Sequence, residues 1–338
     1  MGDLTLLVNK NSNYTSLKDS PFKFKTSEIT IKDDAFHDSG AKRFTEWWYF
    51  DAVFENGYSI QLNIRLLSII KNKFVLIYKR TDIYKDGKLI KHYRKKHRLK
   101  DFIASKELPH VNISGEDVIK GSIDKTTGKM SYDLSFHFDN TSADLQFKAT
   151  TQGWQGKNPG GDGWAVILPR AEVTGTIKVE NKEIKVKGIG YHDHNWDVRY
   201  AATQNNHGWF WGKIYSKNFT VTWATIYKNK NIGQPLLVIN ENDNGYINFK
   251  PEEIKFIGDK IGLQNKKMIP HHFTLEANNE KAKLNFSMDV KEFHHDTVMI
   301  RYHYWRYHMM CKGTISVGNK TEKVSDIQIA EFLRFKNK

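Results

Sequence analysis

The sequence predicts an all-β protein built from two tandem antiparallel β-barrels. Two observations lead to this fold class: apolar and polar residues alternate along much of the chain, and two landmark segments occur twice. The first landmark, residues 48–54, returns at 209–215, and the second, residues 175–182, returns at 313–320. Repetition over this length indicates a duplicated domain and not a solenoid. We expect one domain over residues 1–198 and a second over residues 199–338.

Length and composition agree with two folded domains. The chain has 338 residues, of which 39% are hydrophobic and 13% aromatic, so two cores can be filled. It contains one cysteine, Cys311, so no intrachain disulfide is expected and a reducing, cytoplasmic setting is favoured. The first ten residues lack the apolar segment of a signal peptide, and no apolar run is long enough to predict a membrane span.

Strand patterns follow one another in order along both halves. Strict alternation of apolar and polar residues, typical of strands, is found at 58–66, 74–78, 130–138 and 219–227. Turn dipeptides that fit tight hairpins are Asn56-Gly57, Asp86-Gly87 and Asn244-Gly245. We expect short helical turns near 99–105 and 114–120. The landmarks are farther apart in the first half than in the second, and we expect the additional residues of the first half in 91–108 or 153–163. Halves of this kind are expected to close into barrels, which removes exposed sheet edges.

The charge of the chain is strongly positive, at +14 from 52 Lys and Arg against 38 Asp and Glu. Because the lysines are spread over the predicted turns and no recognition motif accompanies them, nucleic-acid binding is not expected. One denser cluster contains Lys91, Arg94, Lys95, Lys96, Arg98 and Lys100. It is either a solvated surface or a patch that contacts an anionic membrane where a hydrophobic ligand enters.

A polar segment, Tyr191-His192-Asp193-His194-Asn195-Trp196, follows the closing landmark of the first half, where the second half has the mostly apolar segment 329–334. On a strand, His192, His194 and Trp196 share one face, while Tyr191, Asp193 and Asn195 share the other. Such histidines can act as an acid or base, or bind a metal. No further ligands lie nearby in the sequence, so neither a metal nor a cofactor is expected. The alternative is a buried hydrogen-bond network that joins the domains.

Two further strands carry polar groups among aromatic residues. In Glu46-Trp47-Trp48-Tyr49-Phe50-Asp51 the aromatic side chains must point to both faces of the sheet. Burial of Glu46 beside them would raise its pKa, as in catalytic acids. Residues 302–308, with Tyr304, carry polar aromatics on both faces, so this strand lines either a cavity or an interface between the halves.

The segments 46–51 and 191–196 resemble the two most recognisable motifs of the carotenoid 1,2-hydratase (hydroxyneurosporene synthase) family and its AttH-like relatives. The closing segment 329–335 is similar as well. The resemblance implies two lipocalin-like barrels of the calycin type in tandem. Members of the family add water to a terminal isoprenoid double bond, and relatives hydrate prenylated phenolics or cyclise polyenes.

The resemblance implies catalytic roles for His194 and Trp196, which match the His-x-Trp of the central family motif. The family also uses a Tyr and an Asp on a following strand, but residues 219–227 contain no carboxylate here. In addition, Asp197 replaces the glycine that usually follows the Trp. The residues that could replace the missing acid are Asp193, Asp197 and Glu46.

We therefore expect a hydratase-like lyase that adds water, with acid assistance, to a C=C bond of a hydrophobic isoprenoid or polyene substrate, or performs a related cyclisation. His194 would be the acid or base, Asp193 would position it, Tyr191 would donate a hydrogen bond, and Glu46 is a further candidate acid. The expected ligand contacts are Trp196, Trp48, Trp209, Trp211, His192, Trp223 and Tyr304. The alternative is a non-catalytic lipocalin-type carrier, which the missing carboxylate favours.

Overall fold

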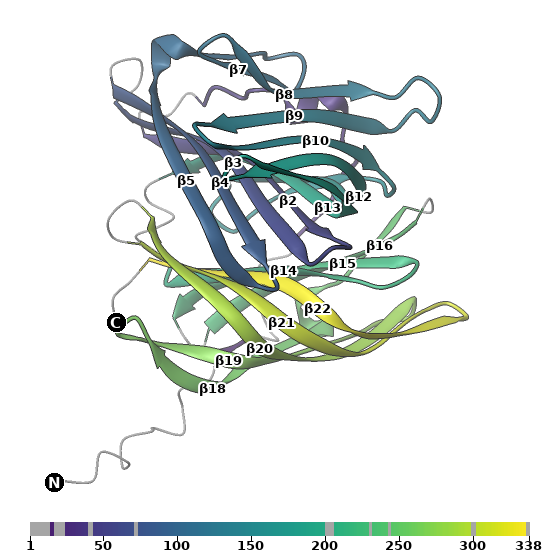
Figure 1. The fold of residues 1–338 in the computed structure, drawn as a ribbon. Helices are drawn as coiled ribbons and strands as arrows, with labels where there is room; N and C mark the ends of the chain where they lie inside the picture. Colours follow the sequence, from purple (N-terminus) through teal and green to yellow (C-terminus); the bar gives the residue numbers. More distant parts are fainter. Residues whose placement is uncertain are drawn as a thin grey trace, which may run out of the picture. The chain divides into compact units, whose positions relative to one another are not determined.

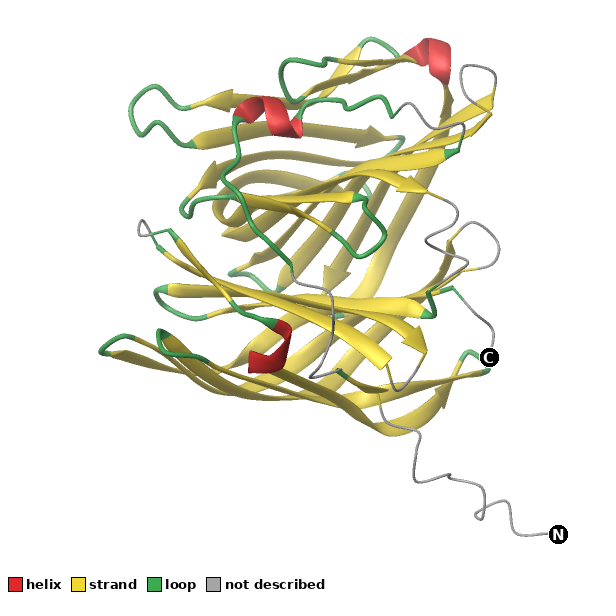
Figure 2. Cartoon of the chain, turned by 180° about the vertical axis from the view of Figure 1, so that it is seen from behind, coloured by secondary structure: helices red, strands yellow, loops and turns green. Residues whose placement is uncertain are grey.

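The computed structural model describes residues 14–16, 24–39, 43–70, 74–199, 206–229, 232–242, 245–298 and 302–335. Nearly all of these residues lie in β-strands (Figures 1 and 2). Three short 3₁₀ turns are the helical elements of this part of the chain: η2 (Ile31–Asp34), η3 (Leu99–Asp101) and η4 (Pro251–Glu253). None of the described helical elements has the length and apolar character needed to cross a membrane. The predicted all-β fold of two tandem lipocalin-like barrels is confirmed.

The chain divides into two compact units. We call Lys25–Ala202 with Asn240–Gly245 the N-terminal unit, and Thr203–Ile239 with Tyr246–Lys338 and the residues up to Phe24 the C-terminal unit. The short strand β1 (Tyr14–Thr15) pairs with β18 (Ile254–Gln264), so it belongs to the C-terminal unit although its position in the sequence placed it in the first domain.

The N-terminal unit is a 12-stranded sheet in the order β5-β4-β3-β2-β13-β12-β10-β9-β8-β7-β6, with β11 beside β12. Its described strands are β2 (Phe44–Phe54), β3 (Tyr58–Ile70), β4 (Phe74–Lys85), β5 (Lys88–Arg98), β6 (Phe102–Ala104), β7 (His110–Ile113), β8 (Glu116–Ile123), β9 (Met130–Phe138), β10 (Thr141–Ala149), β11 (Trp154–Lys157), β12 (Gly163–Val179) and β13 (Lys182–Arg199). Alternate residues of these strands fill an apolar core, as the period-2 pattern predicts.

The C-terminal unit is a 10-stranded sheet in the order β1-β18-β19-β20-β21-β22-β14-β15-β16-β17. Its remaining described strands are β14 (Gly208–Tyr215), β15 (Phe219–Asn229), β16 (Ile232–Glu241), β17 (Tyr246–Asn248), β19 (Lys267–Asn278), β20 (Ala282–Val298), β21 (Tyr302–Val317) and β22 (Lys320–Arg334). The run β20-β21-β22-β14-β15-β16 repeats the run β10-β12-β13-β2-β3-β4 of the other unit, so the two sheets share a topology.

The repeated landmarks occupy equivalent places in the two sheets. Gly175 and Gly313 each let a neighbouring strand approach closely, because an added Cβ would lie 2.1 Å from the Asp144 carbonyl oxygen and 2.0 Å from that of Asn285. The additional strands β6 and β11 of the N-terminal unit lie in the two stretches expected to hold its extra residues. The helical turn expected near 99–105 is η3, whereas that expected at 114–120 is wrong, since β8 covers most of this stretch.

The alignment of the opening landmarks is displaced by one residue. Trp48 pairs with His194 and lies in the core, while Trp209, its expected counterpart, packs in a separate small cluster. In the C-terminal unit it is Phe210 that pairs with a residue of the closing strand, Phe332, inside the core. Because a shift of one residue exchanges the two faces of a strand, Phe210 is the structural counterpart of Trp48.

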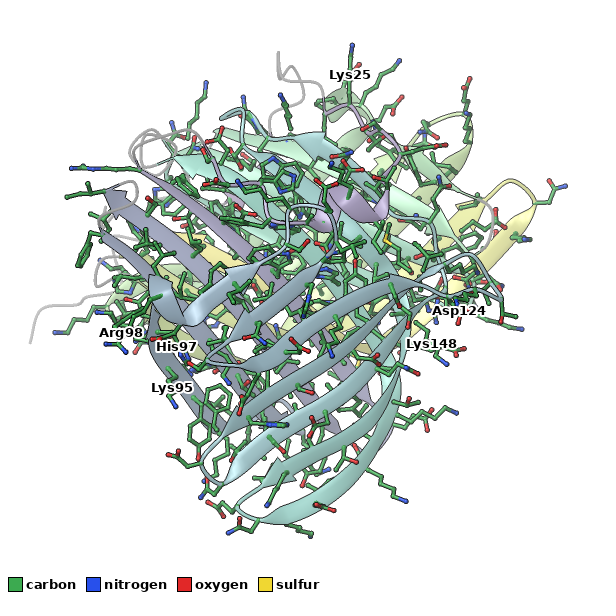
Figure 3. All side chains as sticks on the ribbon, turned by 90° about the horizontal axis from the view of Figure 1, so that it is seen from above. Lys25, Lys95, His97, Arg98, Asp124 and Lys148 are labelled. Carbon is green, nitrogen blue, oxygen red and sulfur yellow. The ribbon has the colours of Figure 1, made fainter. Side chains whose placement is uncertain are left out.

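The basic cluster of residues 91–100 follows β5 and η3. Lys95 and Arg98 extend from this strand into solvent (Figure 3), and Arg98 pairs with Asp101 at 3.2 Å. Lys91 instead pairs with Glu180. The cluster is therefore an exposed basic strand, and its contact with an anionic membrane stays a prediction.

Replacing Gly313 by alanine is expected to lower the free energy of unfolding by about 1–3 kcal/mol, because the methyl group would push β20 away from β21. Urea unfolding measures this change. Lys312→Ala, an exposed position on the same strand, is the control and should change stability little. Equal stabilities of the two variants would contradict the close approach of the strands.

Candidate functional site

Two histidines point into the interior of the N-terminal unit. His192 and His194 are fully buried on β13, and each is paired with an inward aromatic residue of β2. The His194 ring stacks on Trp48, with 4.5 Å between the ring centroids. The corresponding strand β22 of the C-terminal unit has Ala330 and Phe332 at its inward positions. The sequence indicates that the segment 191–196 is polar and its counterpart 329–334 mostly apolar. In the structure, this difference lies in the interiors of the two barrels.

The carboxylate of Asp34 lies between the two histidines. It belongs to η2, ahead of β2, and is fully buried. His192 Nε2 lies 2.9 Å from Asp34 Oδ2, and His194 Nδ1 lies 3.1 Å from Oδ1. The Tyr132 hydroxyl, from β9, donates to Oδ2 at 2.8 Å, and Trp48 Nε1 donates to the Asp34 carbonyl at 3.0 Å. Groups from three separate strands thus hold this one residue.

A second buried carboxylate, Glu46 of β2, lies on the other side of His194. His194 Nε2 is 3.1 Å from Glu46 Oε1, and the backbone N–H of His37 donates to the same oxygen at 2.9 Å. The ring nitrogen Nδ1 of His37 is 3.6 Å from it. Glu46 Oε2 is buried and has no hydrogen-bond partner among the described residues. His194 therefore forms ion pairs with two carboxylates, Asp34 and Glu46, and each carboxylate has one oxygen without a hydrogen bond among the described residues.

These contacts determine the charge of the cluster. Burial lowers the pKa of His194, but the hydrogen bonds to Asp34 and Glu46 outweigh burial and raise it to about 9. Burial raises the pKa of Asp34, yet the charges and hydrogen bonds of both histidines bring it well below its usual range. The raised pKa expected for Glu46 is wrong: burial acts in that direction, but hydrogen bonds from His194 and His37 lower it overall. At neutral pH an imidazolium therefore lies between two carboxylates.

The cluster reaches the protein surface at His37 and Trp196. Their rings stack with centroids 3.9 Å apart and planes 6° apart, and the His37 side chain is 24% exposed. Gly163 makes room for the indole, because a Cβ there would lie 2.1 Å from it. Asp197 follows at a bulge in β13 with φ of 53°, and Ser39 Oγ donates to its carboxylate at 2.6 Å. Asp197 thus secures the bulge and does not enter the histidine cluster.

Asp193 and Tyr191 lie on the opposite face of β13, as strand alternation predicts. The Tyr191 hydroxyl donates to Asp193 Oδ2 at 2.9 Å, and Trp164 Nε1 donates to the same oxygen at 3.0 Å. The expected role of Asp193 in positioning His194 is therefore wrong, because the two side chains point away from each other. Asp34 and Glu46 take that role instead.

Four expected ligand contacts belong to the C-terminal unit: Trp209, Trp211, Trp223 and Tyr304. Trp223 is buried in the core of that unit. Trp211 Nε1 and the Tyr304 hydroxyl both donate to the carboxylate of Glu331, which also pairs with Arg306 at 2.6 Å. All members of the histidine cluster belong to the N-terminal unit, so these four residues are not among them.

Three members of the cluster were not predicted: Asp34, His37 and Tyr132. Asp34 and His37 precede the first long strand, in a segment without a periodic pattern, so no signal in the sequence indicated them. Tyr132 could have been found, because it lies on the predicted inward face of residues 130–138 and a buried phenol requires a polar partner. Among the described residues, one group has the spacing of metal ligands: His37, Glu46 and His194 offer donor atoms within 4.8 Å of one another.

The sequence matches no protein-family model and no curated protein. Solved structures, in contrast, share the fold. One is a Nitrosomonas europaea protein provisionally assigned as an AttH, with a TM-score of 0.65 and 13% identity over 90% of this chain and 96% of that chain.

Kievitone hydratase from Nectria haematococca has a TM-score of 0.58 and 11% identity, over 91% of this chain and 93% of its own. CghA, solved with Sch210972, has a TM-score of 0.54 and 11% identity, over 96% of this chain and 98% of the CghA chain. This chain therefore has the lipocalin-like fold of AttH-like and hydratase proteins.

Proposed function

We propose that the protein is a hydratase-like enzyme that adds water to a C=C bond of a hydrophobic substrate. The arrangement of Asp34, His194 and Glu46 carries the proposal: a protonated imidazole is held between two carboxylates, directly beside two indole rings. A carrier needs an apolar cavity but has no need of a buried proton donor, which is costly to place inside a core.

The chemistry requires a proton and a site that tolerates positive charge. His194 Nε2 supplies a proton to Glu46 Oε1, the carboxylic acid so formed protonates one alkene carbon, and a carbocation forms at the other carbon. The carboxylates of Asp34 and Glu46 and the faces of the indoles stabilise this cation. Water then attacks the cation, and its released proton returns through Glu46 to His194. The sum of these steps is the addition of one water molecule, and the acid is restored.

The surroundings of the cluster and the proteins that share the fold support an isoprenoid or polyene substrate. Trp48, Trp196 and Phe36 surround the cluster with apolar surface, which suits an isoprenoid or polyene chain. The motif resemblance to carotenoid hydratases points in the same direction, as does the fold shared with kievitone hydratase. The exposed basic strand β5 fits delivery of such a substrate from an anionic membrane surface in the cytoplasm.

One observation favours the alternative of a carrier. Asp34 is fully buried, and its hydrogen bonds with His192 and Tyr132 also attach η2 to β13 and β9. In a carrier, this attachment would be the only role of these hydrogen bonds. A carrier would also need no catalytic carboxylate on β15, which agrees with the absence of one from residues 219–227. The enzyme and the carrier differ in whether a bound alkene is converted.

Replacing His194 by glutamine is expected to lower hydration at least about 100-fold, because the amide cannot carry the proton. Prenylated phenols and linear polyenes are incubated with the protein in ¹⁸O-labelled water, and mass spectrometry detects products that contain the label. His137→Gln, at an exposed histidine bonded to Asp144, is the matched control. Binding of these compounds without incorporation of label by the unmodified protein would support the carrier.

Replacing Gly163 by alanine is expected to displace the Trp196 indole from its stack with His37. Because the indole contributes apolar contact area, KM should rise more than kcat falls. The ring shift can be followed by NMR of the tryptophan side chains. Lys157→Ala, at the exposed position that pairs with Gly163 on β11, is the control, and equal kinetic constants for the two variants would contradict this role of Trp196.

The pKa of His194 predicts how stability depends on pH. Because the pKa rises on folding from 6.5 to about 9, the stabilisation is complete below about pH 6.5 and is lost as the pH rises through 9. The loss is of the order of 3 kcal/mol. Urea unfolding in the presence of a chelator should show it in the unmodified protein and much less in His194→Gln. Parallel pH profiles of the two proteins would contradict the raised pKa.

A further inference from the structure

Three possible metal ligands, His37, Glu46 and His194, lie together where the cluster reaches the surface. Some of their nitrogen and oxygen atoms form no hydrogen bond within the described part of the chain. Four buried atoms of the cluster lack a hydrogen-bond partner among the described residues: His37 Nδ1, Glu46 Oε2, Asp34 Oδ1 and His194 Nδ1. His194 Nε2 lies 3.1 Å from Glu46 Oε1. Asp34 Oδ1 and His194 Nδ1 form an ion pair with each other at 3.1 Å, whereas His37 Nδ1 and Glu46 Oε2 can accept a further occupant.

The spacing of these atoms fits a small divalent ion. Bonds of about 2.0–2.2 Å in a tetrahedral zinc site place the ligand atoms roughly 3.2–3.6 Å apart. The distances from Glu46 Oε1 are 3.1 Å to His194 Nε2 and 3.6 Å to His37 Nδ1. All three donor atoms lie within 4.8 Å of one another. Small shifts of the partly exposed His37 ring would complete the geometry.

Neighbouring side chains hold the two histidines of this group in place as possible metal ligands. Asp34 Oδ1 lies 3.1 Å from His194 Nδ1, the ring nitrogen that faces away from Glu46. A carboxylate behind a histidine ligand fixes the ring and strengthens it as a donor. The stack on Trp196 sets the plane of the His37 ring. Each histidine of the group is thus oriented by a neighbour that would not itself touch the ion.

We propose that His37, Glu46 and His194 form a binding site for a divalent ion of the zinc class. Two imidazoles and one carboxylate are ligands that suit zinc and its neighbours and not magnesium or calcium, which prefer oxygen. Three protein ligands leave a fourth position, and the side chain of the ligand His37 is 24% exposed. Such open sites are typical of exchangeable or reactive zinc.

Metal and proton compete for the same nitrogen. His194 Nε2 must lose its proton to bind an ion, so a bound metal would remove the proton that hydration requires. This consequence rests on the proposed function, whereas the binding itself does not. The ion would therefore act as an inhibitor of hydration, and its removal by a chelator would restore activity.

Metal binding is tested directly on the full chain. Protein freed of metal by a chelator is titrated with Zn²⁺ in a calorimeter and with Co²⁺ in an absorption spectrometer, where tetrahedral binding produces intense visible bands. We expect one ion per chain. His37→Ala should bind more than 100-fold more weakly, and Asp34→Asn about 10- to 100-fold more weakly. His37 is partly exposed, so its variant should fold, and thermal unfolding verifies this.

His110→Ala is the control, because His110 and Asp117 form an exposed pair that an adventitious ion could bind. Unchanged affinity in His37→Ala, or loss of binding in His110→Ala, would overturn the site and indicate an adventitious ion only. Binding and turnover separate the two proposals. Zinc that binds at His37 without inhibiting hydration refutes the proton role of His194, and hydration without zinc binding refutes the metal site.

Discussion

The interior of the N-terminal unit depends on the carboxylate of Asp34. Two imidazoles and one phenol converge on it inside a barrel whose core is mainly apolar. Removing one member of such a buried set leaves the others charged or unsatisfied, which typically costs about 3–5 kcal/mol. Because the partners come from β13 and β9, this single carboxylate joins η2 to strands far away in the sequence. The same constraint keeps His194 in the only orientation that lets it reach Glu46.

The C-terminal unit shows what the same topology does without such a network. Phe332 and Phe210 stack with ring centroids 3.9 Å apart where the other unit has His194 and Trp48. Its charged pair, Arg306 and Glu331, lies next to these positions on the strands and so points to the other face. The core of this unit is mainly aromatic and aliphatic, and its buried polar groups include the Tyr14 hydroxyl, which lies 3.4 Å from His207 Nε2. Two sheets of related topology thus differ at these positions: one has stacked phenylalanine rings and the other has a buried cluster of histidines and carboxylates.

The proposed proton transfer and the proposed metal binding rest on one geometry. Asp34 and Glu46 concentrate negative charge around His194, and either a proton or a divalent ion can neutralise it. His37 distinguishes the two, since it adds a donor for a metal but is not needed to hold the proton. Its place at the surface, stacked on Trp196, means that solvent composition can decide which occupant is present.

The sequence by itself determined the fold class, the strands and the face on which each residue of β13 lies, because period-2 alternation is a local property of the chain. It therefore predicted that His192 and His194 face one way and Asp193 the other. Only the tertiary structure decided which groups meet them. Asp34 and His37 come from an irregular segment that reaches β13 once the barrel closes, and no local pattern encodes that contact. The pKa of Glu46 likewise followed from these distant partners and not from the aromatic neighbours beside it in the sequence.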